Sequence, residues 1–117
     1  MVEFQRKDFY SYEDFLEIMR LLRAPGGCPW DREQTHSSIR RNFLEETYEV
    51  LDAIDHDDAS GMCEELGDVL WYVALMAELM NVPLEYVMQA NIDKLERRYP
   101  DGFSPAASVN REERENG

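Results

Sequence analysis

Residues 62–80 read MCEELGDVLWYVALMAELM, and this stretch decides the fold that the sequence predicts. Apolar residues recur three or four positions apart along it, which is typical of an amphipathic helix: Met62, Leu66, Val69, Val73, Met76 and Met80. Further apolar residues point in almost every other direction, so we expect partners on several sides of this helix. Trp71 and Tyr72 should then lie in the core or in the seam of a dimer.

Three more helices are predicted around it, at about residues 12–22, 38–54 and 83–98. Ser11 and Asp14 have the spacing of a capping box before the first of these helices. Two glycines and two prolines predict a loop over residues 23–31. Short connections favour antiparallel neighbours, so the expected fold is all-α, a four-helix up-and-down bundle whose core is completed by dimerisation. We expect one domain over residues 1–117, with residues 104–117 forming a mobile tail.

The charge balance excludes some partners. The chain has 25 acidic and 12 basic residues, a net charge of −13, whereas broad nucleic-acid binding needs a basic surface. The longest apolar run, residues 69–77, is too short for a membrane span, and residues 1–6 do not resemble a secretory signal. Cys28 and Cys63 fit no metal or redox spacing and are interpreted as reduced thiols. We therefore expect a cytoplasmic protein that binds neither nucleic acid nor membrane.

Two pairs of carboxylates form the candidate site. Glu46 and Glu49 lie three residues apart in one predicted helix, and Glu65 and Asp68 lie three apart in the next. Each pair borders the apolar stripe of its helix, so packing the stripes together would bring four carboxylates to the edge of the core. Partly buried anions need cations, and oxygen-only ligands suit magnesium, with manganese as a second choice. Gly67, inside the second pair, would allow close approach of a backbone or ligand.

Other interpretations of these acids remain open. A single Glu-x-x-Glu on a helix is usually a solvated face, although two such pairs on consecutive helices are harder to explain in that way. A ferritin-like di-iron centre would need two Glu-x-x-His motifs. Only Glu33 and His36 match that motif, at a loop-to-helix junction, and His56 has Ala53 three positions before it. We rank the di-iron interpretation low.

The last predicted helix carries a cationic face formed by Asn91, Lys94 and Arg98. A lysine and an arginine opposite metal ions would hold a polyphosphate. The alternative is a solvated face whose residues pair with nearby acids.

Together these segments resemble the MazG family of all-α nucleotide pyrophosphohydrolases. The paired acids are similar to the acidic motif of that family, and residues 27–35, GCPWDREQT, resemble the loop before its metal helix. Residues 44–54, LEETYEVLDAI, are similar to that helix, and residues 91–100 resemble the phosphate-side motif. The resemblance extends over about residues 12–103.

The resemblance implies hydrolysis of a nucleoside triphosphate to a monophosphate and pyrophosphate, with cleaning of the nucleotide pool as the expected role. It implies magnesium on Glu46, Glu49, Glu65 and Asp68. Glu45 or Glu49 would orient the attacking water, and Lys94 and Arg98 would hold the phosphates. It also implies an obligate homodimer or a dimer of dimers.

Two alternatives to this function stay open: a nucleotide- or metal-binding regulatory module without turnover, and a phosphoribosyl-ATP type of pyrophosphohydrolase. The preferred base is open as well. Trp30 is the candidate for stacking on it, and the competing interpretation is that Trp30 anchors its loop on the bundle.

Overall fold

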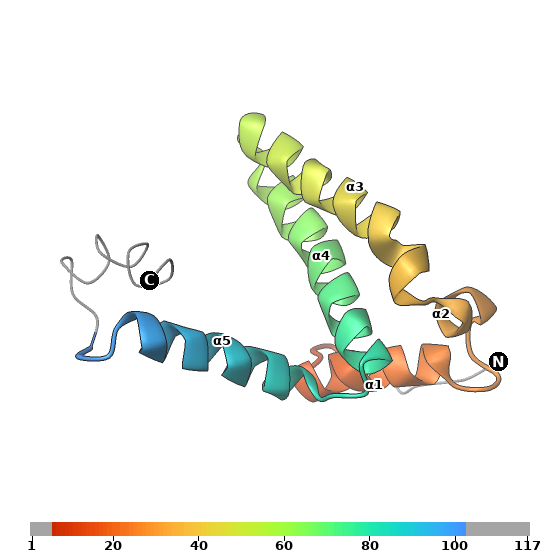
Figure 1. Cartoon of the computed structure of the whole chain (residues 1–117). Helices are drawn as coiled ribbons and strands as arrows, with labels where there is room; N and C mark the ends of the chain where they lie inside the picture. The colour runs from red at the N-terminus through yellow and green to blue at the C-terminus, as the bar shows by residue number, and fades with distance from the viewer. Residues whose placement is uncertain (1–5, 103–117) are drawn as a thin grey trace. The chain divides into compact units, whose positions relative to one another are not determined.

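The computed structural model describes residues 6–102, which are helical with no strand in that range (Figure 1). The helices are α1 Tyr12–Arg23, α2 Pro29–Glu33, α3 His36–Asp55, α4 Ala59–Leu79 and α5 Leu84–Arg98. The predicted all-α class is confirmed. The predicted tail, residues 104–117, lies outside the described residues.

Side-chain caps set the starts of three helices. Ser11 and Asp14 form the predicted capping box of α1. Thr35 and Ser38 form a second one, so α3 begins at His36, two residues before the predicted start. The Asp58 carboxylate accepts a hydrogen bond from the Gly61 amide at 3.0 Å, which starts α4 at Ala59 instead of Met62.

Helix α2 corrects the predicted loop over residues 23–31, because its first residues fall inside that stretch. Pro29 occupies the first turn, where a missing amide hydrogen costs nothing. The turn before it is tight: a Cβ atom on Gly27 would lie 2.3 Å from the Leu21 carbonyl oxygen. Only glycine fits this turn, which folds the chain back on the end of α1.

The described residues form two compact units, one that ends at Met80 and one that begins at Asn81. In the first unit α3 runs along α4, joined to it by a short turn (Figure 1). Ile39 of α3 and Leu75 of α4 are among its fully buried side chains, together with Met19 of α1. Trp71 is half-buried and packs edge-on against Phe15, with ring centroids 5.7 Å apart, which agrees with the predicted place in the core or in the seam of a dimer.

Large apolar side chains remain exposed on both long helices. About half of the surface of each is accessible: Leu44, Leu51, Ile54, Leu66 and Leu70. Leu66 belongs to the predicted apolar stripe of its helix, so part of that stripe is left uncovered within a single chain. A pair of helices buries only a narrow strip of each partner, so the wider stripes stay uncovered. The four-helix bundle and the dimer remain predictions.

In the second unit, α5 follows Pro83, which occupies the N-cap position instead of the predicted first turn. Leu84 is buried, whereas Met88, Ile92 and Leu95 are exposed. Among the described residues, no helix is both long enough and apolar enough to cross a membrane.

Candidate metal site between helices α3 and α4

Three of the predicted carboxylates meet across the α3–α4 pair. One oxygen each of Glu46, Glu49 and Glu65 lies within 4.8 Å of the others. Glu46 and Glu49 are one helical turn apart on α3, and α4 brings Glu65 opposite them. The side-by-side placement expected from the helix spacing is therefore present for these three residues.

Two of these carboxylates have an oxygen with no partner. Glu46 Oε2 and Glu65 Oε2 are buried and accept no hydrogen bond from the described residues. A buried acceptor without a partner is costly, and a buried charge without one costs more. A divalent cation would satisfy both oxygens, so the donor set fits magnesium or manganese.

The crowding of these acids changes their proton affinity. A hydrogen bond that protonated Glu65 makes with Glu49, together with burial, raises the pKa of Glu65 to about 8. Burial raises the pKa of Glu46, and the charges of Asp68 and Glu49 add to that effect. Without a cation, this site holds a proton near neutral pH. A cation that binds here has to displace it.

The other two acids do not belong to this group of three. Asp68 is exposed, but it interacts with Glu46 through its charge and its side chain. Glu45, the other candidate for orienting water, is exposed and pairs with Arg41 at 3.0 Å. One residue along a helix rotates a side chain by about 100°, which turns Glu45 away from the direction of Glu46.

Trp30 lies on α2 in the first unit, with 48% of its surface exposed. The backbone of this segment is held in place: Gln34 Nε2 donates to the Trp30 carbonyl at 2.8 Å, and Arg23 Nε donates to the Asp31 carbonyl at 3.1 Å. The segment is anchored through its backbone, and the indole of Trp30 is left accessible to a ligand.

The three predicted phosphate-side residues lie on α5, in the second unit. Asn91 and Lys94 are exposed, and Arg98 is half-buried. Their spacing of three and four residues does place them on one side of that helix. Their role toward the carboxylates remains a prediction.

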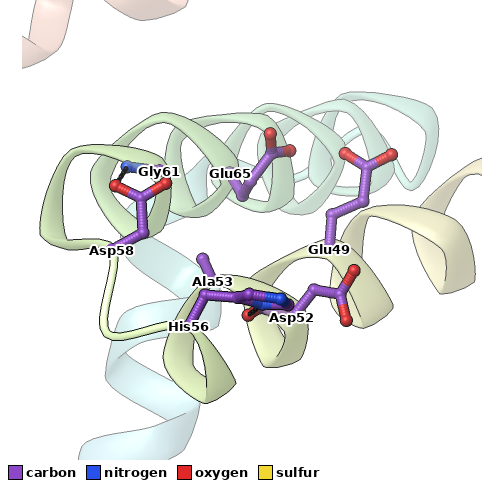
Figure 2. Close-up of a pocket in the computed structure, with 7 residues that line it drawn as sticks. All are labelled: Glu49, Asp52, Ala53, His56, Asp58, Gly61 and Glu65. Carbon is purple, nitrogen blue, oxygen red and sulfur yellow. Dashed lines mark hydrogen bonds between the residues drawn. The ribbon is translucent and has the colours of Figure 1, made fainter.

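The structure adds residues that the sequence interpretation did not include. A cavity of about 270 Å³ continues from Glu49 and Glu65 toward the α3–α4 turn, where Asp52, His56 and Asp58 line it (Figure 2). His56 Nδ1 lies 2.7 Å from the Asp52 carbonyl oxygen, and this hydrogen bond raises the pKa of His56. The spacing of Asp52, three residues after Glu49, was a usable signal for it.

The chain is similar to proteins of a known family. The model of the MazG nucleotide pyrophosphohydrolase domain matches residues 34–103. The nucleoside triphosphate pyrophosphohydrolase of Escherichia coli K12 is 44% identical over 103 residues, which cover 84% of this chain and 39% of that protein. The nucleoside triphosphate pyrophosphohydrolase/pyrophosphatase MazG of Thermotoga maritima is 42% identical over 96 residues, 79% of this chain and 38% of that protein.

The chain thus spans about two fifths of the length of these two relatives. A crystal structure of a mazG-related protein from Thermotoga maritima superposes with a TM-score of 0.70 at 28% identity, covering 90% of this chain and 99% of that one. The match of sequence model, relatives and fold leads to one conclusion: this chain belongs to the MazG nucleotide pyrophosphohydrolase domain family.

Proposed function

We propose that the chain hydrolyses a nucleoside triphosphate to the nucleoside monophosphate and pyrophosphate, with magnesium, or manganese in its place, as cofactor. The observation that carries the proposal is the cluster of Glu46, Glu49 and Glu65, which includes two buried oxygens without a partner. Membership of the MazG family supports the same reaction. A role in cleaning the nucleotide pool of the cytoplasm is part of this proposal.

In this mechanism Glu46, Glu49 and Glu65 hold the cation, and Asp68 completes the set from the next turn of α4. The cation would neutralise charge on the phosphates and lower the pKa of an attacking water. Glu49 is exposed, so it can reach that water and orient it. Glu45 is the weaker candidate for this role because it pairs with Arg41.

The phosphates need cationic groups opposite the acids. We assign this role to Lys94 and Arg98, with Asn91 as a neutral hydrogen-bonding neighbour on α5. Trp30 is assigned to the base, because an exposed indole on an anchored segment can stack on any base. Phosphoribosyl-ATP, or a nucleotide bound without turnover, would use the same groups.

The proposed assembly is a homodimer or a dimer of dimers. Leu44, Leu51, Leu66 and Leu70 are about half exposed on the two long helices, and a second copy would cover them. The bundle core would then be shared between chains.

The test is an assay with common and modified nucleoside triphosphates in the presence of magnesium, in which pyrophosphate and phosphate are measured separately. We expect pyrophosphate and a monophosphate, and no activity in excess chelator. Release of phosphate and a diphosphate would contradict the proposed reaction. Binding of nucleotide without any product would favour the regulatory alternative.

A further inference from the structure

A pair of polar residues continues the carboxylate cluster by one helical turn. Asn42 lies four residues before Glu46 on α3, and Tyr72 lies four residues after Asp68 on α4. Because the two helices run antiparallel, residues before Glu46 come level with residues after Asp68. Asn42 and Tyr72 therefore face one another at the side of the cluster that is nearer to α2.

The surroundings of Tyr72 agree with this placement. The side chain is partly buried, and its phenol interacts with the side chain of Asn42 and with the charge of Glu46. A tyrosine hydroxyl is uncharged in the neutral range. The hydroxyl and the amide can each donate and accept a hydrogen bond.

A nucleotide whose phosphates lie at the carboxylates has two directions in which to place its nucleoside. Toward the α3–α4 turn, the cavity of about 270 Å³ is lined by Asp52 and Asp58 in addition to Glu49 and Glu65. Such an acidic lining suits hydrated cations and repels the remaining phosphates. In the other direction lie the uncharged Asn42 and Tyr72, followed by α2 with its exposed Trp30. The acid on that side is Asp31 of α2, which is buried and acts on Tyr72 through its charge.

We infer that the Tyr72 hydroxyl and the Asn42 amide contact the uncharged hydrogen-bonding groups of the nucleoside, either a sugar hydroxyl or the edge of the base. The two residues are then determinants of substrate choice, whereas the acids and cations of the site recognise only the phosphates. This inference rests on the proposed function, because it takes the carboxylate cluster as the phosphate end of the substrate.

The experiment compares the two products of the proposed reaction as ligands. Calorimetry with saturating magnesium measures the affinity of wild type and Tyr72→Phe for nucleoside monophosphates and for inorganic pyrophosphate. We expect Tyr72→Phe to weaken monophosphate binding about three- to tenfold, which is the range for one neutral hydrogen bond, and to leave pyrophosphate binding unchanged. Asn42→Ala should show the same pattern.

Tyr48→Phe is the matched control, because this tyrosine lies on α3 with 63% of its surface exposed and loses the same hydroxyl. It should leave both affinities unchanged. A panel of ribose and deoxyribose monophosphates identifies the group: a loss confined to ribonucleotides assigns the contact to the 2′-hydroxyl, and a loss that depends on the base assigns it to the base.

Two results would overturn the inference: an unchanged monophosphate affinity in Tyr72→Phe, or equal weakening of monophosphate and pyrophosphate, which would show a general effect on the metal site. Absence of monophosphate binding to wild type would also overturn it. The proposed function fails by a different result, namely no pyrophosphate release by wild type in the product assay.

Discussion

The α3–α4 pair carries two hollows of opposite character. One is the acid-lined cavity of about 270 Å³ beside Glu49 and Glu65, and the other is an apolar hollow of about 600 Å³ lined mainly by α3. The lining of the second includes Ile39, Phe43, Leu44 and Met76, with Thr47 and Arg40 at its polar edge. Glu49 and Thr47 are two residues apart, about 160° around the helix, so the two hollows open on different flanks of α3.

The two flanks of the α3–α4 pair differ in what would stabilise them. Residues on one flank crowd like charges together, which costs stability until a cation binds. Residues on the other flank leave apolar surface exposed, which costs solubility until another surface covers it. The acidic flank therefore needs a cation and the apolar flank needs a covering surface, and different experiments test these two needs.

The largest effect is expected from a change in the acidic flank. Glu65→Gln removes a ligand charge while keeping the size of the side chain, and activity should fall by about 100-fold or more. The measurement is pyrophosphate release at saturating magnesium. Glu64→Gln is the control, since this neighbour is exposed and outside the cluster, and it should stay close to wild type. Equal losses of activity in the two variants would show that the cluster has no specific role in the reaction.

A change in the apolar flank should act on assembly. Leu44 is 55% exposed beside the apolar hollow, and Leu44→Glu places a charge where a second copy is proposed to pack. We expect its dimer dissociation constant to rise at least about tenfold, because one buried unpaired charge costs more than 1.4 kcal/mol. Light scattering over a concentration series measures it. Leu44→Met, which keeps the surface apolar, should resemble wild type; a wild type that is monomeric at micromolar concentration would contradict the assembly.

Magnesium should stabilise the acidic flank directly. At a concentration of about 100 times its dissociation constant, a ligand adds about 2.7 kcal/mol to the stability of the folded state. Glu49→Gln should lose most of this gain and should melt at an equal or slightly higher temperature in chelator, because one repelling charge is gone. Thermal melts of wild type and of Glu49→Gln, each with magnesium and with chelator, measure how much magnesium stabilises the two proteins. An equal response to magnesium in both proteins would show that Glu49 is not a ligand.

A smaller effect than that of magnesium is expected when the pH is changed, because the stability of the metal-free protein should depend on pH with a sign that the pKa shifts define. The pKa of Glu65 is raised from 4.5 to about 8 in the folded state, so between these values the folded chain binds more protons than the unfolded chain. Stability should therefore be fully present below about pH 4.5 for this group and be lost as the pH rises toward 8. The raised pKa of His56 adds a slope of the same sign above pH 6.5.

Melts in chelator at several pH values between 5 and 8 measure this slope. Glu65→Gln should reduce it, leaving the contribution of His56, whereas Glu64→Gln should keep the slope of wild type. A slope that Glu65→Gln does not change would show that the shared proton is absent.

The smallest effect concerns Gly67, on the exposed side of α4. A Cβ atom added there meets nothing within 4 Å among the described residues. Gly67→Ala should therefore raise stability by about 0.5–1 kcal/mol, the usual cost of glycine inside a helix. A thermal melt measures the change. Destabilisation instead would mean that another backbone packs against this glycine, as the sequence interpretation allowed.

Much of the site was predictable because it is local. Glu46 and Glu49 share one helix, and the separation of three residues alone makes them neighbours. The capping box of Ser11 and Asp14 is local in the same way. Helix α2 was missed because its five residues follow a stretch of glycine and proline, and so short a helix depends on its contacts with α1 more than on its own propensity.

The sequence by itself determined the helical class, most helix boundaries to within a few residues, and the pairing of acids within each helix, because these depend on backbone geometry over a single turn. Only the tertiary structure decided which acids from different helices meet: it joined Glu65 to Glu46 and Glu49 and left Asp68 outside this group of three. It also placed Tyr72 beside Asn42. The physical reason is that the rotation of α3 against α4 is set by side-chain packing across the whole seam, which no single helix encodes.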